Sequence, residues 1–123
     1  NGAITSHETQ ALCTCWCWIQ ARTSAPFRVV VMHQPRWGSM PDGQARWIAA
    51  ANAAGVDLVI AGHTHRFSRI DPGSPGFELA RFTTVVLGQD QVGTVRATTD
   101  SIVVIVTTTT GEVLDTITVP RRR

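Results

Sequence analysis

The sequence lacks any hydrophobic run of the roughly 18 residues that a membrane-spanning helix needs. Charge of one sign is also scarce, because 11 Lys and Arg residues against 9 Asp and Glu residues give a formal net charge of +2 at pH 7. So small a charge does not favour nucleic acid or an anionic membrane as a partner. With only three cysteines, any disulfide scheme leaves one thiol unpaired.

The cysteines occupy alternate positions, Cys13, Cys15 and Cys17. Structural zinc sites normally use cysteine pairs spaced by two to four residues, and they need four ligands. The spacing therefore disfavours a zinc site there. Apolar residues make up 43% and charged residues 16% of the 123 residues, an ordinary globular balance. Since no repeat or linker is visible, we expect one domain over residues 1–123, with a poorly defined segment at 1–25.

The most informative stretch is Ala61–Arg66, with the sequence Ala-Gly-His-Thr-His-Arg. It follows residues 56–60, a short apolar run with the composition of a buried strand. Neutral histidine is the commonest side-chain metal ligand, and open α/β sheets place ligands beyond the carboxyl ends of their strands. Gly62, without a Cβ, would let the backbone turn sharply or approach a ligand closely. His63 and His65 are therefore candidate metal ligands.

A second β-rich run, residues 28–32, ends at His33. Between the two runs, helical spacing of apolar residues predicts a helix from an N-cap at Asp42 to Gly55. Strand, helix and strand make a βαβ unit, in which the strands are parallel and the crossover is right-handed. If the two strands are neighbours, about 5 Å apart, His33 comes close to His63 and His65.

Beyond these histidines the apolar pattern changes to period two, which indicates strands. The predicted fold class is α/β, a βαβ unit followed by a mostly antiparallel β meander. A loop is expected over residues 88–93, between the strands expected at 83–87 and 94–98. The run 101–106, which is apolar on both faces, is expected to be a central strand. The strands expected are 67–70, 83–87, 94–98, 101–107 and 112–119.

Two segments together resemble a known family: Val29–Pro35, with the sequence Val-Val-Val-Met-His-Gln-Pro, and Val56–His65, ending in Gly-His-Thr-His. They look like the C-terminal half of calcineurin-like metallophosphoesterases, most of all the bacterial members akin to purple acid phosphatases. The resemblance covers roughly residue 26 to the C-terminus. It implies half of a layered α/β/β/α sandwich and a phosphoester substrate.

The same resemblance implies a site with two divalent or transition metal ions, Fe, Zn or Mn. His33 and His63 would ligate one ion, and His65 would ligate the other. Such ions activate a hydroxide that attacks phosphorus in line. Arg36 and Arg66 lie beside these histidines in the sequence and are candidates to bind the substrate phosphate. The alternative is an ordinary surface role, a solvated side chain for Arg36 and a pair with a surface acid for Arg66.

Several motifs of that family are absent from this sequence: the Asp-x-His pair, the Gly-Asp motif whose later aspartate bridges the metals, and the Gly-Asn-His motif. We therefore expect a fragment of a phosphoesterase domain that is a weak or inactive catalyst by itself and that self-associates through exposed apolar surface. Two alternatives remain open. The three histidines could hold a single zinc ion, or the chain could be a non-catalytic structural fragment.

Overall fold

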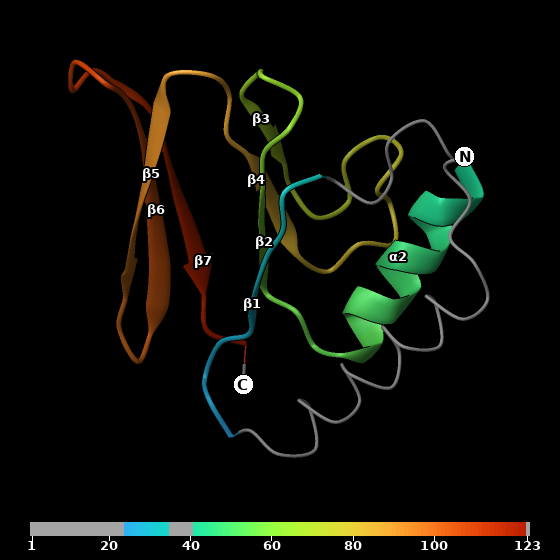
Figure 1. Cartoon of the computed structure of the whole chain (residues 1–123). Helices are drawn as coiled ribbons and strands as arrows, with labels where there is room; N and C mark the ends of the chain where they lie inside the picture. The colour runs from blue at the N-terminus through green and yellow to red at the C-terminus, as the bar shows by residue number, and fades with distance from the viewer. Residues whose placement is uncertain (1–23, 35–40, 123) are drawn as a thin grey trace.

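The computed structural model describes residues 24–34 and 41–122, which form three layers (Figure 1). One helix covers a four-stranded sheet, and a three-stranded sheet packs on the other face of that sheet. Cys13, Cys15 and Cys17, where the sequence disfavours a zinc site, lie outside the described residues. The elements are β1 (Val29–Val31), α2 (Pro41–Ala53), β2 (Leu58–Ala61), β3 (Ser68–Ile70), β4 (Thr83–Val86), β5 (Gln91–Ala97), β6 (Ser101–Thr108) and β7 (Val113–Pro120).

The first sheet has the strand order β1-β2-β4-β3. Strands β1 and β2 are parallel neighbours with Val30 opposite Val59, so the predicted βαβ pairing is confirmed. Strand β4 adds to the other side of β2, also in parallel, and β3 pairs with β4 in the antiparallel direction. Three consecutive strands of this sheet therefore point the same way and end at one edge.

Helix α2 packs through Trp47, Ile48 and Ala51 against one face of this sheet, where Val59 and Phe82 complete the apolar cluster. The helix begins at Pro41, one residue before the expected N-cap Asp42. Proline suits the first helical position, because its fixed φ matches the helix and its missing N–H would have no partner there. Asp42 therefore lies inside the helix, and the N-cap prediction was wrong.

The C-terminal end of α2 is built as the sequence predicts. Gly55 has a φ of 68°, and its N–H donates to the carbonyl of Asn52. The N–H of Val56 donates to the carbonyl of Ala51. This pair of hydrogen bonds is the Schellman arrangement, in which a left-handed glycine reverses the chain and satisfies the last helical carbonyls.

The second sheet is an antiparallel meander with the order β5-β6-β7, as expected. Its central strand, β6, alternates buried and half-buried residues. The buried face packs against Leu58 and Val85 of the first sheet, and it comprises Ile102, Val104 and Val106 with Ile117 and Val119 of β7. Strand β5 begins at Gln91, within the expected loop 88–93, because Gln91 and Val92 already pair with Thr108 and Thr107.

One buried carboxylate ties the two sheets together. Asp57, which precedes β2, has a side chain only 1% exposed. It accepts hydrogen bonds from the backbone N–H of Arg28 at 2.8 Å and from the Nε and Nη2 of Arg122 at 3.1 and 2.8 Å. Arg122 follows β7 and also donates to the backbone carbonyls of Val56 and Arg81. The end of the second sheet is thus fixed to the start of β2.

The predicted α/β class is confirmed at the level of a mixed sheet, a small helical share and an antiparallel sheet. Within the described part of the chain, no helix is long and apolar enough to cross a membrane.

Candidate functional site

The carboxyl ends of β1, β2 and β4 meet at one edge of the first sheet, and backbone hydrogen bonds continue past the strands into the following loops. The N–H of Gly62 donates to the carbonyl of His33 at 2.8 Å, and the N–H of Leu87 donates to the carbonyl of Ala61 at 2.8 Å. The backbone that carries the histidines is therefore held by the sheet. Ligand sites of open α/β sheets lie at this kind of edge.

His33 and His63 come together at this edge. The Nε2 of His33 and the Nδ1 of His63 are 3.0 Å apart, and the rings meet edge to face, with centroids 4.9 Å apart and an interplanar angle of 79°. Both side chains are exposed. The predicted convergence of these two residues, 30 positions apart in the sequence, is confirmed. In the absence of a metal, one ring nitrogen donates and the other accepts.

The loop after β2 carries unusual backbone angles at the histidines themselves. The φ angles of His63 and His65 are 74° and 63°, a left-handed region that residues other than glycine seldom occupy. Gly62 itself has no φ in this region, so the unusual backbone angles lie at the histidines, and the close approach of a ligand to Gly62 stays a prediction. Backbone strain of this kind costs about 1–3 kcal/mol per residue and clusters at functional sites.

A glycine in the loop after β4 allows that loop to pack against the histidine loop. A Cβ on Gly88 would lie 2.8 Å from the backbone nitrogen of Phe67 and 2.9 Å from the carbonyl carbon of Arg66. The neighbouring Gln89 donates its N–H to the carbonyl of His65 at 3.3 Å. Only glycine therefore fits at position 88, and the two loops support each other.

The structure does not group the other predicted site residues with His33 and His63. His65 and Arg66 are exposed, whereas Arg36 lies outside the described residues. Among residues 24–34 and 41–122, no three or more His, Cys, Asp and Glu side chains are grouped closely enough to hold a metal ion. The structure brings together two of the three predicted ligands, and the assignment of metal ligation to His33, His63 and His65 stays a prediction.

The histidine pair nevertheless fits one side of a metal site. Metal–imidazole bonds are about 2.0–2.1 Å long, so two nitrogens 3.0 Å apart have the separation of neighbouring ligands on one ion. At this separation the two facing nitrogens cannot both carry a proton. A metal ligand is the unprotonated nitrogen of a neutral imidazole. Both properties suit a shared cation, and both leave the remaining coordination positions to other groups.

Sequence reasoning missed Gly88 and the buried carboxylate of Asp57. The signal for Gly88 is a glycine directly after an apolar strand, and the signal for Asp57 is an acidic residue inside an otherwise apolar run. Asp90 lies in the same loop as Gly88 and has a φ of 59°. It is not grouped with the histidines.

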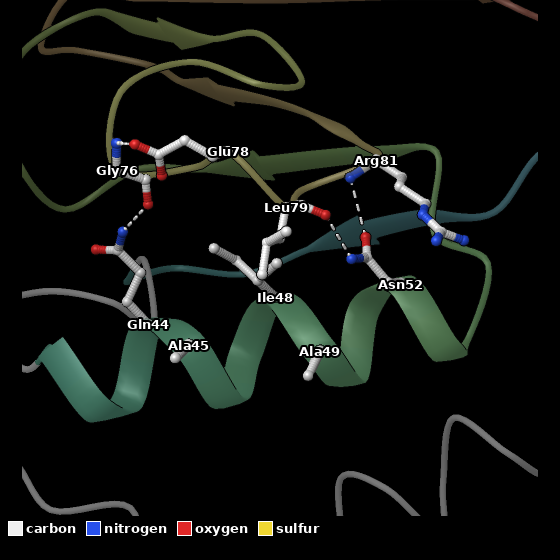
Figure 2. A pocket seen from close by; sticks show the side chains of 9 residues that line it. All are labelled: Gln44, Ala45, Ile48, Ala49, Asn52, Gly76, Glu78, Leu79 and Arg81. Atoms are coloured by element: carbon white, nitrogen blue, oxygen red, sulfur yellow. Dashed lines mark hydrogen bonds between the residues drawn. The ribbon is translucent and has the colours of Figure 1, made fainter.

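A separate groove of about 520 Å³ lies between α2 and the loop 76–81 (Figure 2). Asn52 bridges its two sides, donating to the carbonyl of Leu79 at 2.8 Å and accepting from the N–H of Arg81 at 2.9 Å. Gln44 donates to the carbonyl of Gly76. The backbone N–H groups of Glu78 and Gly76 hold the pKa of the Glu78 carboxyl below its ordinary value. The side chains of Asn52 and Gln44 therefore hold the loop on the helix, whereas Glu78 accepts from the N–H of Gly76 within the loop.

No family model matches this chain, and no curated protein matches it.

Proposed function

We propose that this chain carries the histidine half of a two-metal phosphoester hydrolase site, in a domain of the calcineurin-like metallophosphoesterase type. The observation that carries the proposal is the 3.0 Å contact between His33 and His63. Two parallel strands that are neighbours in the sheet deliver these side chains to one edge. The Gly-His-Thr-His sequence and the lone histidine that follows β1 fit the same family.

The local backbone supports this assignment. Left-handed φ angles at His63 and His65 are retained although neither residue is glycine, and the tight contact at Gly88 holds the neighbouring loop against them. A purely structural turn would be served as well by glycine or asparagine at these positions. Strain kept at two imidazoles in one loop is better explained by a need to place them.

Each residue has a role in this proposal. His33 and His63 hold one metal ion, His65 holds the second, and Arg66 supplies positive charge for the substrate phosphate. When bound, Fe, Zn or Mn ions would polarise the phosphoryl oxygens and lower the pKa of a coordinated water. The histidines supply neutral ligands, so a carboxylate from outside these motifs has to balance the charge of the ions.

Metal binding tests the proposal directly. We expect the purified chain to bind Zn²⁺ in isothermal titration calorimetry, and His33→Ala and His63→Ala each to weaken binding by at least about tenfold, since each removes one of two paired ligands. Gln34→Ala is the matched control, because Gln34 is an exposed neighbour of His33 and is not a ligand in the proposal. Equal binding by all four proteins, or no binding by the parent chain, would refute it.

The stoichiometry and the activity separate the remaining alternatives. Two ions per chain support the two-metal site, and one ion lost on either His33→Ala or His65→Ala supports a single zinc held by three histidines. With p-nitrophenyl phosphate we expect very slow turnover by the metal-loaded chain alone. A fast rate abolished by a chelator would contradict the expectation that this chain is a weak catalyst.

A further inference from the structure

The loop between β4 and β5, residues 87–90, passes from the first sheet to the second (Figure 1). At its start, the N–H of Leu87 donates to the carbonyl of Ala61 at 2.8 Å. At its end, the carbonyl of Asp90 accepts from the N–H of Thr109, the residue after β6, at 3.2 Å. The loop is therefore fixed to one sheet at each end.

The middle of this loop touches the histidine loop, residues 62–67. Gln89 donates its N–H to the carbonyl of His65 at 3.3 Å, and His65 is one of the two histidines with a left-handed φ. Such a conformation at a residue other than glycine persists only where the surrounding structure holds it. The bond from Gln89 is a contact that can do so.

The position of the loop is narrowly defined. Because a Cβ on Gly88 would lie 2.8 Å from the backbone nitrogen of Phe67 and 3.0 Å from the Cα of Arg66, the two loops are in direct backbone contact. A displacement of Gly88 would therefore change the contact with the segment that directly follows His65. The geometry of His65 depends on where residues 88 and 89 are held.

The side chain of Gln91 holds this part of the loop. Its Oε1 accepts from the N–H of Gly88 at 2.6 Å, and the side chain is half-buried. Gln91 is the first residue of β5, and it pairs with Thr108 of β6. The acceptor for Gly88 is thus anchored on the second sheet, and its connection to His65 runs through two residues only.

We propose that Gln91 is a positioning residue for His65. By holding the N–H of Gly88, it keeps the loop 87–90 against the histidine loop and fixes the backbone from which the His65 imidazole projects. This inference rests on the proposed function, in which His65 holds the second metal ion. Groups that orient a ligand without touching the metal change metal affinity by about 10–100-fold when they are removed.

Nuclear magnetic resonance of the metal-free chain tests the positioning directly. Gln91→Met keeps the length of the side chain and removes the acceptor, whereas Gln91→Glu keeps an acceptor oxygen. We expect Gln91→Met to shift the backbone and ring resonances of His65 and to speed hydrogen exchange of the Gln89 amide by at least about tenfold. Gln91→Glu should retain the slow exchange. Unchanged His65 resonances in Gln91→Met, or equal acceleration by both variants, would overturn the proposal.

Gln44→Met is the matched control. Gln44 is also half-buried, and its side chain also bonds to the backbone of a loop glycine, the carbonyl of Gly76 beside α2. The control therefore loses a hydrogen bond of the same kind from a different loop, and the His65 resonances should stay as in the parent chain. An equal shift of these resonances in Gln44→Met would assign the effect to general loss of stability and overturn the proposal.

Calorimetric titration with Zn²⁺ separates this inference from the proposed function. When the parent chain binds two ions, we expect Gln91→Met to weaken the second by about tenfold and to leave the first, held by His33 and His63, unchanged. Equal weakening of both ions would overturn the positioning role. A parent chain that binds no Zn²⁺ refutes the proposed function, whereas the His65 resonances of the metal-free chain still decide whether Gln91 positions that residue.

Discussion

Asp57 is the residue whose environment most clearly depends on a distant part of the chain. Its carboxylate is buried and paired with Arg122, 65 positions later. Removal of one partner of a buried ion pair leaves a charge without compensation, which costs more than the pair itself contributes.

We therefore expect Arg122→Ala to lower the free energy of unfolding by about 2–3 kcal/mol, measured by urea denaturation. Arg121→Ala is the control, because Arg121 is exposed and its side chain donates to the carbonyl of Thr99. That control should cost less than about 0.5 kcal/mol. Equal losses in the two variants would show that Arg122 does not act through Asp57.

Gly88 and Gly62 lie in the two loops of the candidate site, and the structure predicts that an added methyl group lowers stability at Gly88 but not at Gly62. We expect Gly88→Ala to destabilise the protein by about 1–3 kcal/mol, because the new Cβ would collide with the backbone of Phe67. Gly62→Ala should be nearly neutral, since its Cβ would meet the carbonyl oxygen of His33 at an ordinary 3.7 Å. Thermal unfolding measures both, and the reverse ranking would contradict the loop packing.

Strand β4 contains a buried hydroxyl group, that of Thr84, which should lower the free energy of unfolding. Thr84 is fully buried beside Val59, and its Oγ1 has no hydrogen-bond partner among residues 24–34 and 41–122. A buried polar group without a partner keeps its desolvation cost. We expect Thr84→Val to raise the free energy of unfolding by up to about 1 kcal/mol, measured by urea denaturation.

The reciprocal change on the same strand serves as the control. Val85 is also fully buried but faces the other sheet. Val85→Thr should lower the free energy of unfolding by about 1–2 kcal/mol, since it adds a hydroxyl to an apolar layer. If Thr84→Val also destabilises the protein, the hydroxyl of Thr84 has a partner or a structural role after all.

At the scale of elements, the sequence was informative wherever one pattern dominated. The helical spacing before Gly55 and the β-branched runs of β1, β2 and β6 predicted the corresponding elements to within one or two residues. Where pattern and turn chemistry conflicted, as at the start of β5, cross-strand pairing decided the boundary. The stretch 77–82 contains neither helix nor strand, and hydrogen bonds with the Asn52 side chain fix its backbone to α2.

For the molecule as a whole, the meeting of His33 and His63 could be predicted because parallel neighbours end at one edge. The φ angles of the histidines, the collision avoided at Gly88 and the partner of Asp57 could not be predicted. They depend on how loops and sheets separated by up to 65 residues pack in space, and local patterns carry no information about such distances. The ion pair at Asp57 also joins both sheets, which no single segment indicates.

The ion pair between Asp57 and Arg122 has a consequence for the order in which the chain folds. We expect the βαβ unit to form first, because its contacts are closer in sequence, and Asp57 to acquire its guanidinium partner after β5, β6 and β7 have paired. Contacts between residues far apart in sequence carry a large entropy of loop closure and slow folding. Loss of Arg122 should therefore mainly accelerate unfolding and leave the refolding rate almost unchanged.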